Sequence, residues 1–365
     1  MLPVSDEIRA LVALSLVPGL GPRLTAAILD RFGSATAARQ ARPEELDDVP
    51  RLGSKLVRDF HTAMATADVD GELALAESHK VELLAYTDGH YPAALSTISD
   101  RPHLLYCRGQ LEARDSNAVA IVGSRHGTAY GRRVAERLAS SLARAGFTIV
   151  SGLARGIDGA AHRGALTSGR TIAVLAGGLR RIYPPEHAEL AMEIERSGAL
   201  LTESTMAMQP LAEMFPARNR IISGLCRGII VVEAAERSGA LITARHAAEQ
   251  GRAVFAVPGP VDSPASAGTL KLIRDGATLI RGPEDVIEEL DGVAPIVSPA
   301  VDTPGPSLKL DDRQLRVWIA VSEPRHIDDL SRQLGLPSSE LAGLLLGLEM
   351  KKAIRRLPGS RFERA

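Results

Sequence analysis

Apolar runs alternate with amphipathic helical patterns from residue 118 to about residue 290. The runs are AVAIVG (118–123), FTIVSG (147–152), TIAVLAGG (171–178), ALLTE (199–203), GIIVVEA (228–234), AVFAVPG (253–259) and ATLI (277–280). Strands that are apolar nearly throughout are covered by helices on both faces, as in parallel sheets. The pattern predicts an α/β fold with a Rossmann-like, doubly wound, mainly parallel sheet. The preceding stretch 91–111 is expected to pack on its edge.

A helical part precedes this domain. Residues 1–70 contain two segments, VPGLGPRLTAAILDRFG and VPRLGSKLVRDF, in which a Gly-containing turn leads into an amphipathic run. The segments resemble helix-hairpin-helix (SAM-like) modules, whose turn amides and helix N-termini contact DNA phosphates. The second segment has Arg51 where the first has Gly19. A purely structural helical domain therefore fits this part as well as a DNA-binding one.

The Rossmann-like domain is expected to cover residues 71–290. Residues 291–309, rich in Pro, Val and small side chains, predict a linker. Residues 310–365 carry three helical patterns and a hairpin with Pro358-Gly359 at its tip, which predicts a small winged helix. Basic side chains gather near the tip, so DNA binding and protein docking are both open for this part; they are Lys351, Lys352, Arg355 and Arg356.

Composition is that of a soluble globular protein, with 45% hydrophobic and 24% charged residues. A net charge of −1 gives no uniformly basic surface, but residues 120–225 hold 13 Arg against 8 Asp or Glu. Only Cys107 and Cys226 occur, without metal-ligand spacing, so buried thiols in a reducing cytoplasm are expected and no metal. The absence of a signal-peptide pattern or a membrane span also predicts a cytoplasmic protein.

Ligands of an open parallel sheet bind beyond the carboxyl ends of its strands. Gly123-Ser124-Arg125 follow the first strand, SGLARGIDGAAH (151–162) the second and Gly177-Gly178 the third. Gly123 and Gly152 would let a ligand approach the backbone, and helices beginning near Gly127 and Gly156 would direct free amides toward it. Several anion-binding turns at one edge suit an extended polyanion better than a single phosphate.

The stretch FPARNRIISGL (215–225) adds a second basic group to this region. Arg218 and Arg220 offer bidentate phosphate contacts, Asn219 an amide for a base edge, and Phe215 a ring for stacking. Taken alone, the stretch is more typical of a helix start with Pro216 near the first turn and salt-bridged arginines. Together with Arg125 and Arg155, it favours single-stranded nucleic acid as the ligand.

Enzymatic chemistry has weaker support. Gly123, Gly127 and Gly131 are spaced by four, unlike the G-x-G-x-x-G of dinucleotide sites, and no P-loop occurs. Asp158 and His162 could form an acid/base pair, but such a pair more often caps and packs a helix start. We therefore expect no enzymatic activity and no cofactor.

Several motifs in order are similar to those of the DNA-processing protein A (DprA, also Smf) family. They are VGSR (122–125), SGLARGIDGAAHRGAL (151–166), GGLRRIYPPEH (177–187), FPARNRIISGL (215–225), SGALITARHA (238–247) and VPG (257–259). The resemblance implies an extended Rossmann fold that binds single-stranded DNA, protects incoming DNA in natural transformation and loads the RecA recombinase. It also implies a homodimer formed through the central domain. Residues 269–280 are a candidate for the dimer face and equally a candidate for ordinary helix and strand core.

The resemblance carries over to individual residues. Some relatives have a lysine after the Tyr-Pro pair of the third loop; here Pro185 follows Tyr183-Pro184, and Arg180 or Arg181 is the candidate for that charge. Phe215 or Tyr183 is expected to stack on a base. The candidate DNA-binding residues are Gly123, Ser124, Arg125, Gly152, Arg155, Gly156, Arg180, Arg181, Phe215, Arg218, Asn219 and Arg220.

Two other functions stay open. Similar Rossmann proteins hydrolyse nucleoside monophosphates, although their P-G-G-x-G-T motif is interrupted here by VPGPVDSPASAGT. The chain could also be an adaptor whose end domains bind proteins and whose central site is vestigial.

Overall fold

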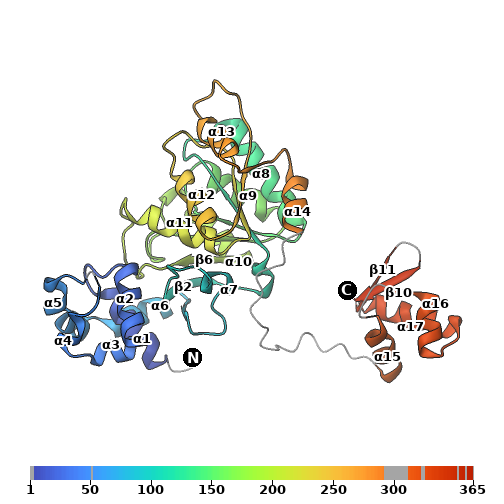
Figure 1. Cartoon of the computed structure of the whole chain (residues 1–365), viewed down its shortest axis with the longest axis horizontal. Helices are drawn as coiled ribbons and strands as arrows, with labels where there is room; N and C mark the ends of the chain where they lie inside the picture. The colour runs from blue at the N-terminus through green and yellow to red at the C-terminus, as the bar shows by residue number, and fades with distance from the viewer. Residues whose placement is uncertain are drawn as a thin grey trace. The chain divides into compact units, whose positions relative to one another are not determined.

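The computed structural model describes residues 4–50, 52–291, 311–321, 325–351, 353–357 and 360–364. The chain divides into two compact units, Met1–Ser298 and Pro299–Ala365 (Figure 1). Apart from Asp291, which ends a helix, the predicted linker 291–309 lies outside the described residues, as does the predicted hairpin tip Pro358-Gly359.

The N-terminal part is helical, as its sequence pattern predicts. Its helices are α1 (Asp6–Leu16), α2 (Pro22–Phe32), α3 (Ala35–Gln40), α4 (Pro43–Leu46), α5 (Ser54–Thr66) and α6 (Val69–Ser78). The first Gly-containing turn reaches a left-handed backbone at Gly19, with φ +82°, and leads into α2, which starts with Pro22 after Gly21. The second turn leads into α5 after Gly53. Both amphipathic runs therefore begin as helices directly after their glycines.

The described strands of the larger unit form one nine-stranded sheet in the order β1-β2-β6-β5-β4-β3-β7-β8-β9. They are β1 (Val81–Ala85), β2 (Leu104–Gly109), β3 (Ala118–Val122), β4 (Thr148–Ser151), β5 (Thr171–Val174), β6 (Ala199–Thr202), β7 (Gly228–Val231), β8 (Ala253–Ala256) and β9 (Thr278–Leu279). From β6 to β9 along the sheet all pairs are parallel. The predicted α/β fold class is confirmed, and each predicted run contributes a strand.

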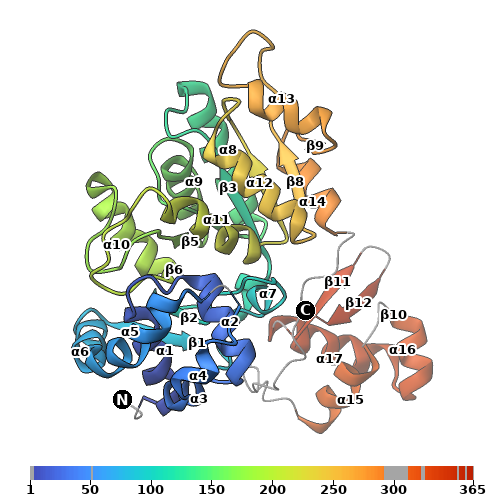
Figure 2. The same cartoon turned by 60° about the vertical axis from the view of Figure 1, so that its left-hand side comes forward.

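The edge beside β6 extends beyond the predicted sheet. β2 pairs with β6 in antiparallel register, with Tyr106 opposite Thr202, and β1 pairs with β2. The stretch 91–111 thus packs on the edge, as expected, and supplies β2 and the short helix α7 (Ala93–Ser96). The N-terminal helices gather at this end of the sheet, and β8 and β9 lie at the other end (Figure 2).

Helices cover both faces because side chains alternate along each strand. Val119 and Ile121 of β3 point to a core with α8 (Ala129–Arg144), α9 (Ile157–Leu166) and α14 (Pro283–Asp291). Ala118, Ala120 and Val122 point to the opposite core, with α11 (Met214–Gly224) and α12 (Gly239–Glu249). The remaining elements of this unit are η1 (Ala113–Ser116), η2 (Pro185–His187), α10 (Ala188–Ser197) and α13 (Ala267–Arg274).

The order of the strands sets the position of a ligand crevice. After β3 the chain adds β4, β5 and β6 on one side, and then returns to add β7, β8 and β9 on the other side. The direction of winding therefore reverses beside β3. The loops at the carboxyl ends of the strands diverge at such a reversal, which is where doubly wound sheets bind their ligands.

The smaller unit has the element order predicted for a winged helix. It consists of α15 (Asp312–Ala320), β10 (Arg325–His326), α16 (Ile327–Leu334), α17 (Ser338–Met350), β11 (Ile354–Leu357) and β12 (Arg361–Arg364). The three strands pair in the order β10-β12-β11. Val317, Leu330, Leu341 and Leu345 are buried in its core, so one side chain or more from each helix faces inward.

Candidate functional site

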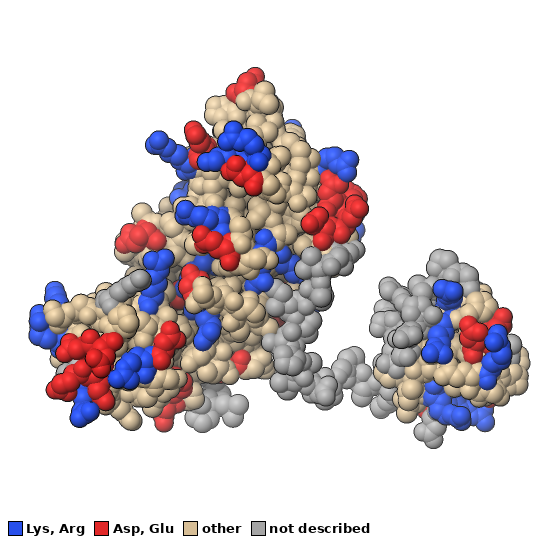
Figure 3. Space-filling view, in the orientation of Figure 1, with Lys and Arg blue, Asp and Glu red and all other residues tan. Residues whose placement is uncertain are grey.

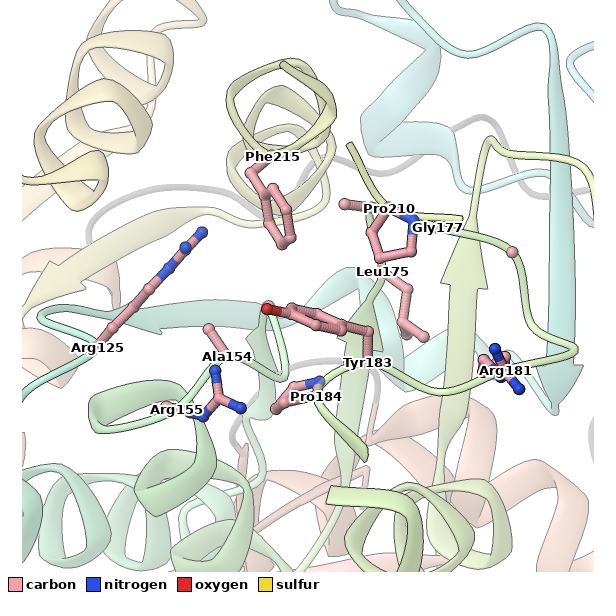
Figure 4. Close-up of a pocket in the computed structure, with 13 residues that line it drawn as sticks. Arg125, Ala154, Arg155, Leu175, Gly177, Arg181, Tyr183, Pro184, Pro210 and Phe215 are labelled. Carbon is pink, nitrogen blue, oxygen red and sulfur yellow. The ribbon is translucent and has the colours of Figure 1, made fainter. Parts of the chain in front are cut away.

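Loops that follow four strands meet in one pocket at the carboxyl edge of the sheet (Figure 4). Its lining residues come from the loops after β3, β4, β5 and β6 and from the start of α11: Arg125, Gly152, Ala154, Arg155, Leu175, Ala176, Gly177, Gly178, Arg181, Tyr183, Pro184, Pro210 and Phe215. Five predicted site residues, Arg125, Gly152, Arg155, Arg181 and Phe215, therefore line a single pocket.

The turn after β3 is held by backbone hydrogen bonds. The Ser124 amide donates to the Glu233 carbonyl at 2.7 Å, and the Ser124 carbonyl accepts from Ile157 N at 3.2 Å. Gly156 has φ +76°, and a Cβ there would lie 2.2 Å from the Ser124 carbonyl oxygen, so both its conformation and its packing require glycine. The turns after β3 and β4 are thus joined, and Arg125 is left exposed at the rim.

The glycines spaced by four make room for protein side chains. A Cβ on Gly123 would lie 2.7 Å from Ile157 Cγ1, and one on Gly127 would lie 2.8 Å from Ile157 Cδ1. A Cβ on Gly131 would lie 2.3 Å from Glu233 Cδ. The spacing that disagrees with a dinucleotide motif therefore serves the packing of α8 against Ile157 and Glu233.

The prediction of free amides is wrong for two donors at the start of α8, and two amides of the turn before α9 are also hydrogen-bonded. The Thr128 amide donates to Glu233 Oε2 at 2.8 Å, and the Gly131 amide donates to Thr128 Oγ1 at 3.0 Å. Asp158 Oδ2 accepts from the amides of Gly152 and Ala154, at 3.2 and 3.3 Å. Amides withdrawn from water need acceptors, and side chains of the protein supply them here.

Cationic and aromatic side chains follow one another across the pocket (Figure 4). Arg125 Cζ lies 4.6 Å from the centroid of the Phe215 ring. The rings of Phe215 and Tyr183 meet edge to face at 6.0 Å, and Arg155 Cζ lies 6.0 Å from the Tyr183 centroid. Tyr183 is 42% exposed. The row Arg125–Phe215–Tyr183–Arg155 therefore places a guanidinium at each end of two adjacent rings.

The loop after β5 carries the remaining predicted cations. The amides of Gly178 and Arg180 donate to the carbonyls of Met208 and Met206, which ties this loop to the one after β6. Arg181 lines the pocket, and Arg180 is exposed but does not line it. In Figure 4, Arg181 and Arg125 lie on opposite sides of Tyr183. An extended anion could meet Arg125 and Arg181 at the two ends of the pocket.

Arg218 lies beneath the pocket and is 6% exposed. Its Nη1 donates to the Gly152 carbonyl at 2.8 Å and also to the Val174 carbonyl. Burial lowers the pKa of this guanidinium to about 10, although the negative charge of Asp158 acts to raise the pKa. A Cβ on Gly152 would lie 2.6 Å from Arg218 Nη1, so this glycine makes room for the arginine. Arg218 thus ties α11 to the ends of β4 and β5. It lies at the same carboxyl edge of the sheet as Arg125.

Arg220 and Asn219 turn away from the pocket. Arg220 is 3% exposed, and its Nη2 donates to both carboxylate oxygens of Glu203 at 2.9 and 2.8 Å. The Asn219 amide donates to the Gly239 carbonyl at 3.4 Å. Both arginines of α11 therefore hold protein groups, and direct DNA contact by Arg218, Asn219 and Arg220 stays a prediction.

The Asp158–His162 pair packs the start of α9 against the turn after β4 and against β5. His162 is buried, and its Nδ1 lies 2.7 Å from Thr171 Oγ1. Burial lowers the pKa of His162 from 6.5 to about 3, so the ring is neutral. Burial also raises the pKa of Asp158, which binds the amides given above. Of the two predicted roles, the geometry fits packing at a helix start, although neither side chain caps the helix.

The neutral state of His162 predicts acid sensitivity. The unfolded chain takes up this proton near pH 6.5 and the folded chain only near pH 3, so the contribution of His162 to stability is lost as the pH falls below 6.5. Between pH 7 and pH 5 the loss is about 2 kcal/mol of unfolding free energy. Urea unfolding followed by circular dichroism measures the unfolding free energy at pH 7 and at pH 5. Its decrease between these two pH values should be smaller by this amount in His162→Gln than in the wild type. An equal fall in both proteins would contradict the assignment.

Charges of both signs are interspersed on the face of the larger unit shown in Figure 3. Binding of an anion therefore depends on the local groups of the pocket. Within the part of the chain that the structure describes, no cluster of three or more His, Cys, Asp or Glu side chains is arranged to hold a metal ion. Among the described helices, none is both long and apolar enough to span a membrane.

The fold and the pocket define a doubly wound α/β protein with a ligand crevice at its carboxyl edge. The model of the DNA recombination-mediator protein A family matches residues 82–291, and the model of the DprA winged helix domain matches residues 301–360. The chain belongs to the DprA/Smf family, which confirms the resemblance found in its motifs.

Individual relatives agree with this assignment. Protein Smf of Escherichia coli is 41% identical over 303 residues, which cover 80% of this chain and 79% of the relative. DNA processing protein DprA of Bacillus subtilis is 44% identical over 220 residues, 60% of this chain and 74% of the relative.

Two solved structures extend the comparison. That of DNA processing protein A from Streptococcus pneumoniae has a TM-score of 0.68 at 36% identity, and the match covers 78% of this chain and 98% of that one. A structure of DNA processing protein A from Helicobacter pylori, described for its single-stranded DNA binding mode, has a TM-score of 0.53 at 32% identity. That match covers 58% of this chain and 96% of the other.

Proposed function

We propose that the pocket binds single-stranded DNA. Arg125, Arg155 and Arg181 bind successive phosphates, and Tyr183 and Phe215 stack on bases. The observation that carries the proposal is the row of two adjacent rings with a guanidinium at each end. Exposed rings beside cations are the usual means of binding single strands, because every base offers a face for stacking.

Single strands are favoured over duplexes because the bases of a duplex are already stacked on each other. Sequence preference is expected to be low, since phosphate contacts and ring stacking are common to all sequences. In this proposal Gly123, Ser124, Gly152 and Gly156 shape the turns that carry Arg125 and Arg155. Arg218 positions the ends of β4 and β5 from beneath the pocket.

Fluorescence anisotropy with labelled oligonucleotides tests the proposal. A mixed-sequence single strand should bind more tightly than the matching duplex. For three neutralised phosphates, log K should fall with log salt with a slope of about −2. Equal affinity for the duplex, or affinity that does not change with salt, would contradict the proposal.

The central unit is the proposed site, in preference to α17 of the winged helix. The sequence of α17, SSELAGLLLGLEM, contains Glu340 and Glu349 and no Lys or Arg. A helix without cations is poorly suited to lie against phosphates. The winged helix is therefore the better candidate for docking a protein.

We further propose that the chain acts as a recombination mediator, which protects incoming single strands in natural transformation and loads RecA onto them. The description of the matching family supports this role. The proposal includes no enzymatic activity: incubation with nucleoside monophosphates should release no free base. Release of base would favour the nucleotide-hydrolysing alternative.

The homodimer is proposed to form at the free edge of the sheet. β9 is the last strand at this edge, and Leu279 is 44% exposed. Unpaired strand edges are prone to associate, and residues 269–280 of the candidate dimer face include β9. Light scattering should give the mass of a dimer, and Leu279→Glu should reduce it to that of a monomer.

A further inference from the structure

We propose that Glu186 sets the affinity of the pocket for DNA by competing with phosphate for Arg155. The inference rests on the proposed function and concerns the same pocket. Glu186 belongs to η2, directly after the loop that carries Tyr183, and Arg155 belongs to the turn after β4. Arg155 lines the pocket, and the carboxylate thus reaches it from a segment just outside the lining residues.

The contact between the two side chains is direct. Arg155 Nε donates to Glu186 Oε1, and each side chain is 49% exposed. This hydrogen bond raises the pKa of Arg155 and lowers the pKa of Glu186, so both groups stay charged. His187 Nδ1 lies 2.9 Å from the Leu153 carbonyl, a contact that joins η2 to the turn after β4. The competing carboxylate is therefore held close to Arg155 by the fold.

Arg125 provides the contrast. Its guanidinium lies over the Phe215 ring, and within the described residues no carboxylate lies at ion-pair distance from it. Arg125 can accept a phosphate without losing a charged partner, whereas Arg155 must exchange one. Ion pairs at such exposure are weak, so a phosphate can displace Glu186. A strand already bound at Arg125 and on the rings would bring its next phosphate to Arg155 at high effective concentration.

Glu186→Gln tests the inference because glutamine keeps the size of the side chain and removes its charge. The full chain with this change should bind a single strand about three to ten times more tightly at low salt. The slope of log K against log salt should become steeper, because in the wild type the freed Glu186 carboxylate takes up a cation and offsets part of the counterion release at Arg155. A residue with only a structural role would not change this slope.

Two further variants serve as controls. Glu189→Gln removes an exposed carboxylate from the first turn of α10, three residues further along the chain, and should leave the dissociation constant within about twofold. The double variant Arg155→Ala with Glu186→Gln should bind a single strand no more tightly than Arg155→Ala alone, because the gain in affinity from Glu186→Gln acts through Arg155.

Each outcome decides the matter. If the wild type binds and Glu186→Gln binds equally or more weakly, the inference is overturned; weaker binding would mean that Glu186 orients Arg155 for DNA. The inference is also overturned if Glu186→Gln still raises the affinity when Arg155 is replaced by alanine. If the wild type binds no single strand even at low salt, the proposed function fails together with the inference.

Discussion

Replacing Arg125 with alanine should weaken the binding of single-stranded DNA by at least about tenfold, or about 1.4 kcal/mol. The guanidinium is exposed at the rim of the pocket, 4.6 Å from the Phe215 ring, so the variant loses a phosphate contact and the cation beside the stacking ring. The side chain is not part of the core, so the melting temperature should stay the same. Anisotropy titrations at one fixed salt concentration measure the loss.

A matched control is Arg144→Ala. Arg144 is also exposed, but it lies in the last turn of α8, which runs from the carboxyl edge of the sheet toward the opposite edge. The Arg144→Ala variant should retain nearly all of the affinity for single-stranded DNA. An unchanged dissociation constant for Arg125→Ala, or an equal loss in both variants, would count against the pocket as the DNA site.

Arg218→Ala should reduce stability far more than Arg125→Ala does. The change leaves the carbonyls of Gly152 and Val174 without this donor, and it removes the positive charge that favours the ionised form of buried Asp158. Breaking a buried charge network of this kind costs about 3 kcal/mol, which corresponds to a fall of about 6–12 °C in melting temperature for a domain of this size.

The measurement should use circular dichroism or calorimetry. These methods follow the helices and strands of the larger unit, whereas the single tryptophan of the chain, Trp318, belongs to the core of the smaller unit. Arg125→Ala serves as the control for loss of an arginine without loss of buried contacts. A change below about 1 kcal/mol in Arg218→Ala would refute the structural role assigned to this residue.

The strands and the position of the pocket could be predicted from sequence because both depend on local patterns. Runs of apolar residues mark strands that are covered on both faces, and β3, β4 and β5 follow from them directly. Because parallel strands present their carboxyl ends at one edge, the residues after them had to meet. Strand β1 was missed because Glu82 interrupts its apolar run, which the predicted strands keep throughout.

The roles of the arginines could be predicted only in part. Arg125 and Arg218 are alike as residues, but only Arg218 lies three and four positions before buried Ile221 and Ile222, which places it on the buried face of α11. That periodicity was a signal for burial. The roles of Glu233 and Glu186 had no local signal, because each contacts a loop that is distant in the sequence.

Photocrosslinking tests most directly whether the row of rings and arginines holds the strand. The full chain would be irradiated with a single-stranded oligonucleotide that contains 5-iodouracil, and the adducts would be mapped by mass spectrometry. If bases stack on the two rings of the pocket, the adducts should fall on Tyr183 or Phe215 and should be lost in Arg125→Ala at equal concentrations. Adducts confined to residues 299–365, or to surfaces away from this pocket, would contradict the account.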